Sequence, residues 1–289
     1  MKPVMASFDD GEENPLTPPD EPDEPGEPDE EVLRGGVANA GSVRRVGAVV
    51  LRPANEHSAT IHALLRHVRS AGFDGVPEPL ALDPEGEERL AFIPGDVPYP
   101  PFPTWSQTDD ALASTVKLLR RFHDATAGFV APAGASWSSE MADPDGGDVI
   151  CHNDVCPENV VFRAGVAVAL LDFDFAAPGS RLFDLARLAL MTVPIDAPED
   201  AARTGRTGLD PFSRLRVAAD AYGLGPNRQQ LVDAVDRNVA SGGVFLQGRI
   251  DRGEQPFVAM LDAMGGMERY DRRRAWFAAH RQRFVESVG

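Results

Sequence analysis

A polar segment near the middle of the chain carries side-chain types and a spacing that suit phosphoryl transfer. It reads His152-Asn153-Asp154-Val155-Cys156-Pro157-Glu158-Asn159 and fits the catalytic-loop pattern H-x-D-x-x-x-x-N. This reaction needs metal-neutralised phosphates, an in-line acceptor hydroxyl and a group that accepts the proton of that hydroxyl. We expect Asp154 to accept the proton. Asn159 follows five residues later and is expected to turn its carbonyl oxygen toward Mg²⁺, a hard cation that prefers oxygen ligands.

A second metal ligand is predicted where an apolar strand ends. Asp172 lies eighteen residues after Asp154, in Leu171-Asp172-Phe173-Asp174, and takes the place of the aspartate of the Asp-Phe-Gly motif. The runs Val160–Phe162 and Val166–Leu171 flank a turn and predict a hairpin of suitable length between the two motifs. Each motif alone is a weak signal, but together they predict one metal site.

Residues 32–96 are expected to form a small lobe around a sheet. Apolar side chains recur at helical spacing after Ser58, an expected N-cap, and predict a helix with one buried face. Three strands precede this helix and two follow it. The predicted strands are Leu33–Arg34, Ser42–Val46, Ala48–Arg52, Glu78–Leu82 and Arg89–Ile93.

Residues 97–289 are expected to form a larger, mainly helical lobe. Leu112, Val116, Leu119 and Phe122 form an apolar stripe that predicts a helix ending near residue 126. His123, beside Phe122, is expected to pack in the core and not to catalyse. The further predicted helices are Leu182–Met191, Phe212–Tyr222, Arg228–Val239, Pro256–Met264 and Arg272–Val285.

The 289 residues have an ordinary globular composition, but their charge is unevenly distributed. Residues 1–31 contain twelve carboxylates and a single base, Lys2, so most of the formal charge of −17 lies there. This segment is rich in Pro, Asp and Glu, has almost nothing apolar to bury, and is predicted to be a disordered tail. The chain has no basic footprint for nucleic acid, no apolar stretch of about 18 residues and only two cysteines. We therefore expect a cytoplasmic enzyme with neither a nucleic-acid nor a membrane partner.

From Val32 to the C-terminus the chain resembles the aminoglycoside phosphotransferase and choline kinase-like superfamily, and more closely the actinobacterial members of the phosphotransferase enzyme family. The resemblance implies an α+β, protein-kinase-like bilobal fold. Its N-lobe would hold a small antiparallel five-stranded sheet, its C-lobe would be mainly helical, and ATP or GTP would bind in the cleft. The motifs that stand in family order are Ile150-Cys151-His152-Asn153-Asp154, Leu171-Asp172-Phe173-Asp174, Pro178-Gly179 and Asp184-Leu185-Ala186.

The resemblance assigns supporting roles in the catalytic loop. It implies that Asp184 supports the loop through backbone hydrogen bonds and that His152 is also structural. The family usually has glycine where Asn153 stands, and Asn tolerates unusual backbone angles better than most residues. Outside the loop, Asp174 is either a further metal or cleft carboxylate or the partner in a structural hydrogen bond.

The resemblance also implies how the nucleotide phosphates are bound. Arg52 stands where the family has the lysine of the third strand, and its planar guanidinium must meet phosphate oxygens with a different geometry. The glutamate that normally pairs with this lysine is missing from the following helix, where Ile61 and His62 stand. For His62, a solvated or packed position on the helix is favoured over a contact with phosphate.

Two other segments are expected to contact the nucleotide. The glycine-rich turn that contains Gly36 and Ser42 either lays backbone N–H groups over the phosphates or is a plain hairpin turn. The backbone of Phe92 and Ile93, where the lobes join, is expected to meet the adenine.

The predicted function is therefore that of a small-molecule kinase, which moves the γ-phosphoryl group of Mg-ATP or Mg-GTP to a hydroxyl of a small acceptor. The alternative is a nucleotide-binding pseudokinase with a regulatory or scaffolding role. Arg52 and its missing glutamate favour that alternative, whereas intact Asp154, Asn159 and Asp172 oppose it. A protein kinase is disfavoured because the chain has no Ala-Pro-Glu segment and no activation-loop insertion.

Overall fold

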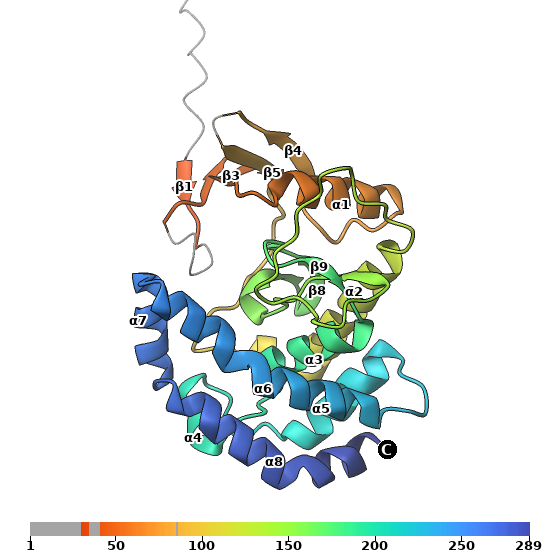
Figure 1. Cartoon of the computed structure of the whole chain (residues 1–289), viewed down its shortest axis with the longest axis vertical. Helices are drawn as coiled ribbons and strands as arrows, with labels where there is room; N and C mark the ends of the chain where they lie inside the picture. Colours follow the sequence, from red (N-terminus) through yellow and green to blue (C-terminus); the bar gives the residue numbers. More distant parts are fainter. Residues whose placement is uncertain (1–29, 35–40, 85) are drawn as a thin grey trace, which may run out of the picture.

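The computed structural model describes residues 30–34, 41–84 and 86–289. The chain forms a small sheet-containing lobe and a larger helical lobe, and in Figure 1 the small lobe lies above the helical lobe. The predictions for residues 1–29 of the acidic tail, and for Gly36, fall outside the described residues.

The small lobe contains one antiparallel sheet of five strands, as predicted. The expected strand at 33–34 instead lies at Glu30–Val32, so the last two residues assigned to the tail belong to the sheet. Arg44 pairs with Glu30 across the two strands, 2.9 Å apart, and such opposite charges support the pairing. The strands, in spatial order, are β1 (Glu30–Val32), β2 (Arg44–Val46), β3 (Val49–Pro53), β5 (Glu87–Ala91) and β4 (Pro79–Leu82).

The helix of the small lobe, α1 (Ser58–Ser70), buries the predicted apolar face. Its N-cap residue is His57, not Ser58, and no side chain caps the helix. Ser58 instead accepts a hydrogen bond from the backbone of Asn55 at 3.0 Å. The buried residues of α1 belong to the same hydrophobic cluster as those of the helical lobe, so the two lobes share a core.

The chain passes between the lobes at residues 92–96 and is pinned there to the hairpin of the helical lobe. Asp96 and Phe162 exchange two backbone hydrogen bonds, each 2.8 Å long. A Cβ on Gly95 would lie 2.4 Å from a methyl group of Val161, so only glycine fits this crossing.

The helical lobe contains all the predicted helices, with differences at their ends. The predicted hairpin is also present. The longest helix runs twelve residues past its predicted end at Val239, through Gly242 and Gly243, where an added Cβ would lie 3.5–3.6 Å from the Tyr270 side chain of the last helix. The helices are α2 (Asp109–Ala125), α3 (Arg181–Thr192), α4 (Pro198–Arg203), α5 (Pro211–Tyr222), α6 (Gln229–Asp251), α7 (Gln255–Met264) and α8 (Glu268–Val288), with short 3-10 helices at Thr104–Gln107 and Pro157–Asn159.

Two features of this lobe were not predicted. One is the short helix α4, and the other is a two-stranded pairing of β6 (Val149–Cys151) with β9 (Ala177–Gly179). The predicted hairpin consists of β7 (Val160–Arg163) and β8 (Val166–Leu170). β6 leads directly into the catalytic loop, and the β7–β8 hairpin connects that loop to Asp172.

None of the described helices combines the length and the apolar character needed to cross a membrane.

Candidate active site

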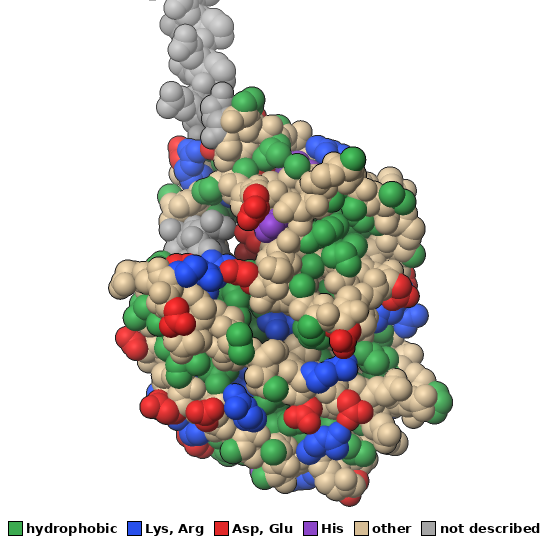
Figure 2. Space-filling view, in the orientation of Figure 1, with side chains coloured by type: hydrophobic (Ala, Val, Ile, Leu, Met, Phe, Trp, Pro, Cys, Tyr) green, Lys and Arg blue, Asp and Glu red, His purple; other side chains and the backbone are tan. Residues whose placement is uncertain are grey.

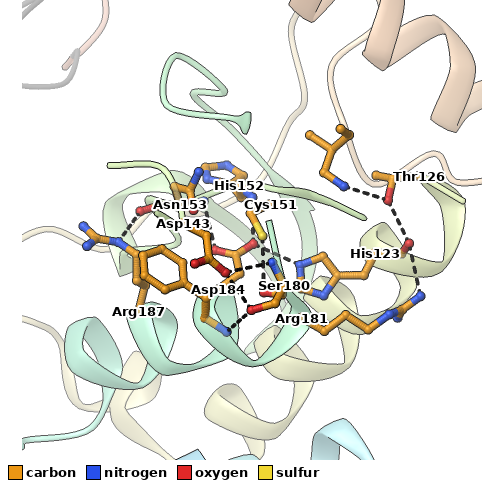
Figure 3. Close-up of polar contacts among 12 residues, drawn as sticks. His123, Thr126, Asp143, Cys151, His152, Asn153, Ser180, Arg181, Asp184 and Arg187 are labelled. Atoms are coloured by element: carbon orange, nitrogen blue, oxygen red, sulfur yellow. Dashed lines mark hydrogen bonds and ion pairs between the residues drawn. The ribbon is translucent and has the colours of Figure 1, made fainter. Parts of the chain in front are cut away.

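Asp184 anchors the catalytic loop from the first turn of α3. Its two carboxylate oxygens accept the backbone N–H groups of His152 and Asn153 at 2.7 and 2.9 Å, and His123 of α2 contacts it at 2.9 Å (Figure 3). Asp184, His123 and His152 are completely buried. Burial alone would raise the pKa of Asp184, but the hydrogen bond from His123, the neighbouring imidazoles and the loop N–H groups hold the pKa below its usual range.

His152 connects the catalytic loop to the segment that carries Asp172. Its Nδ1 accepts the backbone N–H of Asp154 at 3.3 Å, so the ring proton lies on Nε2, which donates to the carbonyl oxygen of Leu171 at 2.9 Å. Burial lowers the pKa of His152, which keeps the ring neutral. A neutral ring with one donor and one acceptor suits both contacts.

Asn153 has the left-handed backbone conformation that explains why glycine is usual at this position. Its φ is 65°, and Asp172 also has a positive φ of 60°. The Asn153 side chain donates to the carbonyl oxygen of Phe175 at 2.8 Å. Arg187 of α3 donates to the Asn153 carbonyl at 2.7 Å. The substitution for glycine therefore adds a tether between the loop and the segment after Asp172.

The structure brings Asp154, Asn159 and Asp172 together. The side-chain nitrogen of Asn159 donates to the Asp154 carboxylate at 3.0 Å, and the backbone carbonyl of Asn159 accepts the backbone N–H of Leu171 at 2.8 Å. The pKa of Asp154 is raised to about 7 by burial and by the negative charge of nearby Asp172. Figure 2 shows a hollow between the lobes with acidic side chains at its edge.

The oxygen atoms at this point suit a magnesium ion. Asn159 uses its amide nitrogen on Asp154, and no hydrogen bond to its carbonyl oxygen Oδ1 is found among the described residues. Asp172 and Asp174 add carboxylate oxygens, which with an amide oxygen are hard ligands of the kind that Mg²⁺ prefers. The donor set therefore fits the ion that the sequence predicts.

Arg52 of β3 points into the cleft toward these carboxylates. Its Nη1 lies 3.1 Å from Asp172, its Nη2 pairs with Asp174, and its Nε lies 2.7 Å from Glu88. Burial alone would lower the pKa of Arg52, but the three negative charges raise it. Asp174 therefore contacts Arg52, which agrees with the expectation of a structural hydrogen bond.

Glu88 and His62 were not predicted as a pair that supports Arg52. Glu88 lies directly opposite Arg52 in the β3–β5 register, and its second oxygen contacts His62 of α1 at 2.9 Å. Both side chains are 2% exposed. The partner carboxylate that is missing from the helix thus comes from the neighbouring strand. The predicted strand began at Arg89, one residue after Glu88, whereas β5 begins at Glu87, so the prediction left Glu88 outside the sheet.

The remaining residues expected to bind nucleotide are less closely tied to the site. Ser42 is exposed in a turn, and among the described residues no hydrogen bond links it to the catalytic loop. Phe92 and Ile93 are half-buried in the crossing between the lobes, and Arg45 stacks on the Phe92 ring at 3.9 Å. Their contacts with nucleotide stay predictions.

The two lobes, the crossing and the supported loop define a protein-kinase-like phosphotransferase fold. A choline/ethanolamine kinase family protein from Mesorhizobium loti has a solved structure that matches with a TM-score of 0.60 at 18% identity, covering 90% of this chain and 92% of that one. An aminoglycoside phosphotransferase from Alicyclobacillus acidocaldarius matches with a TM-score of 0.52 at 16% identity, covering 85% and 91%. These similarities confirm the predicted fold class.

The chain belongs to the phosphotransferase enzyme family, whose family model matches residues 133–219. This region contains Asp154, Asn159, Asp172 and Asp184. A curated relative, the trifolitoxin immunity protein of Rhizobium leguminosarum bv. trifolii, is 33% identical over 214 residues, which are 72% of this chain and 79% of the relative. The superfamily expected from the sequence motifs is thus confirmed.

Proposed function

We propose that this phosphotransferase transfers the γ-phosphoryl group of Mg-ATP or Mg-GTP to a hydroxyl of a small molecule. The observation that carries the proposal is the buried Asp184, which holds the catalytic loop so that Asp154 and Asn159 lie beside Asp172. Such an arrangement supplies a proton acceptor and oxygen ligands at one point, and phosphoryl transfer needs little more than that from a protein.

Asp154 would accept the proton of the attacking hydroxyl. Its pKa, raised to about 7 by burial and by Asp172, lies near neutral pH, where a carboxylate can both accept and release a proton. Asn159 donates to the same carboxylate and so fixes its orientation. The acceptor would thus meet a carboxylate that is already aligned.

Asn159 and Asp172 would hold the magnesium ion, with Asp174 nearby. When bound, the ion neutralises phosphate oxygens and helps to orient them for transfer. Arg52 would contact the phosphates from the opposite lobe, since its guanidinium already points into the cleft. These assignments are supported by the all-oxygen donor set around the loop.

The chemistry of the acceptor is proposed from the relatives. The two structural neighbours are named for choline, ethanolamine and aminoglycosides, all of which carry hydroxyl groups, and the curated relative is named for immunity to trifolitoxin. On the face shown in Figure 2, basic and acidic side chains intermingle over the helical lobe, which does not resemble a footprint for nucleic acid. On the basis of the names of these relatives, the acceptor panel should contain amino alcohols, aminoglycosides and trifolitoxin.

The first prediction is that the protein consumes nucleotide only when an acceptor from this panel is present. Replacement of Asp154 by Ala should lower that turnover by about 10²–10⁴-fold, the usual contribution of a general base. Product formation is measured with ATP and with GTP. Asp233→Asn, which changes an exposed carboxylate on α6, is the control and should keep wild-type turnover.

A different outcome would support the pseudokinase. In that case the wild type would bind nucleotide but phosphorylate no acceptor in the panel, and Asp154→Ala would change nothing measurable.

A further inference from the structure

All three nitrogen atoms of the Arg52 guanidinium contact carboxylates. Nε is committed to Glu88, while Nη1 and Nη2 contact Asp172 and Asp174. The Arg52 side chain is only 11% exposed, and the two aspartates are 22% and 20% exposed. The guanidinium therefore lies between the sheet and the two carboxylates at the proposed metal site.

The inner side of this guanidinium is held by a buried pair. Glu88 contacts Arg52 through Oε2 at 2.7 Å and His62 through Oε1 at 2.9 Å, so both of its oxygens are used. Burial would raise the pKa of Glu88, but the hydrogen bond from His62 and the charge of Arg52 hold it below its usual range. The Glu88–His62 pair thus fixes Nε and leaves the two terminal nitrogens to face the cleft.

The two terminal nitrogens of the guanidinium would compete with a metal ion for the same carboxylate oxygens. Asp172 Oδ1 is a hydrogen-bond acceptor for Arg52 and would also be a ligand of Mg²⁺. A cation that binds Asp172 and Asp174 while Arg52 still contacts them would place two positive charges within a few ångströms. Phosphate oxygens are alternative acceptors for the terminal nitrogens, and arginine binds them in the same bidentate manner.

We infer that Arg52 is an internal cation that occupies Asp172, a proposed metal ligand, and the nearby Asp174 in the nucleotide-free protein and moves to the phosphates when nucleotide binds. This inference rests on the proposed function. Nucleotide would then release the carboxylates for the metal, so metal and nucleotide would bind with positive coupling. By linkage, the metal would strengthen nucleotide binding by the same factor, and such couplings are commonly about 5–150-fold. Glu88 and His62 are positioning residues for this movement, because they hold Nε while the terminal nitrogens change partners.

The test measures binding of Mn²⁺ alone to the full chain, followed by the electron paramagnetic resonance signal of the free ion. Arg52→Gln should bind Mn²⁺ at least about fivefold more tightly than the wild type, since the competing cation is gone. The same variant should bind a non-hydrolysable ATP or GTP analogue more weakly in the presence of EDTA. These two changes have opposite signs, and a general loss of structure would weaken both affinities.

A matched control is available in the same sheet. Arg44 of the neighbouring strand pairs with Glu30 and Glu87 on the surface, and Arg44→Gln should leave both affinities unchanged. Arg52→Lys keeps the charge but has one ammonium in place of the fork, so its Mn²⁺ affinity should lie between those of the wild type and Arg52→Gln. If Arg52→Gln unfolds, Arg52→Gln/Glu88→Gln removes the unpaired buried charge and should still bind Mn²⁺ more tightly.

The inference is overturned if folded Arg52→Gln, or the double variant in its place, binds Mn²⁺ with wild-type or weaker affinity. Arg52 would then hold the carboxylates in position and would not compete for them. This outcome differs from failure of the proposed function, in which the wild type forms no phosphorylated product, because the Mn²⁺ measurement needs neither nucleotide nor turnover.

Discussion

At the scale of single residues, Asp154 and Asp172 are neighbouring carboxylates with different surroundings. Asp154 is contacted by Asn159, and its pKa is raised by burial and by Asp172. Asp172 has a left-handed backbone and is paired with Arg52 from the other lobe. These surroundings are consistent with the proposed roles, in which Asp154 exchanges a proton and Asp172 binds a cation.

These differences predict that two alanine substitutions will differ in kind. Asp154→Ala should slow turnover but leave Mg-nucleotide affinity within about threefold of the wild type, since a general base acts mainly in the transition state. Asp172→Ala should weaken Mg-nucleotide binding about tenfold or more, as well as turnover, because it removes a proposed metal ligand. Calorimetric titration of both variants with Mg-nucleotide checks this prediction, and equal losses of affinity would contradict it.

At the scale of elements, buried ion pairs attach α8 to the segment after α3. Asp196 is 3% exposed and accepts hydrogen bonds from Arg269 at 2.9 Å and from Arg273 at 2.6 and 2.7 Å. Burial alone would raise the pKa of Asp196, but the hydrogen bonds and charges of these arginines hold it below its usual range. The ionised form of Asp196 therefore stabilises the folded protein.

The sign of the resulting pH dependence follows from that lowered pKa. The stabilisation is fully present above the unfolded-state pKa of about 3.9 and is lost as the pH falls through the folded-state value. Asp196→Asn should cost about 3–5 kcal/mol of the free energy of unfolding at pH 7, because it leaves two arginines without their buried partner. The difference from the wild type should shrink as the pH falls below about 4.

Urea unfolding at several pH values measures this effect. Asp233→Asn removes an exposed carboxylate that pairs with Arg281 and should change the free energy of unfolding by no more than about 1 kcal/mol. A cost of Asp196→Asn that stays constant with pH would show that the ionised carboxylate is not the source of the stabilisation.

At the scale of the whole molecule, a loop between α2 and β6 joins the two lobes. This strap, residues 129–146, contacts α1 through Ser136, whose backbone N–H donates to Thr60 at 2.9 Å. On the other side, Asp143 accepts the Ser180 hydroxyl at 2.7 Å, and Glu140 pairs with Arg252 of α6 at 2.8 Å. In Figure 1 the strap crosses in front of α1 and returns to the helical lobe. Movement of one lobe against the other must therefore displace it.

Loss of one strap contact should loosen the strap locally. Thr60→Val removes the acceptor for the Ser136 N–H, and a single hydrogen bond contributes about 0.5–1.5 kcal/mol. Amide hydrogen exchange in residues 131–140, followed by mass spectrometry, should become about 2–10-fold faster. Ser70→Ala, at the exposed end of the same helix, should leave this exchange unchanged. Unaltered exchange in Thr60→Val would mean that the strap does not depend on this contact.

Much of the fold was predictable because its signals are local. The apolar stripe of α2 and the apolar runs of β7 and β8 depend on residues a few positions apart. The C-terminal end of α6 and the pairing of β6 with β9 were missed, because they depend on partners far along the chain. For example, Gly242 and Gly243 weaken the helical pattern in the sequence, and their proximity to Tyr270 of α8 arises only in the folded chain.

The spacing from His152 to Asn159, with Asp172 after a hairpin, was sufficient to define the candidate site, since covalent connection limits how far these residues can separate. The sequence also predicted that Arg52 faces the phosphate site and that Asn153 can replace glycine because Asn tolerates unusual backbone angles, and Asn153 indeed has a φ of 65°.

Only the tertiary structure decided what neutralises Arg52. Glu88 is 36 residues away, and it faces Arg52 because the β3–β5 register puts the two residues directly opposite each other. A shift of that register by one residue would turn Glu88 to the other face of the sheet. Its contact with His62 depends in turn on how α1 packs beside the sheet. The sequence by itself determined the reactive groups, whereas their ionic partners were decided by strand register and helix packing, which no local spacing encodes.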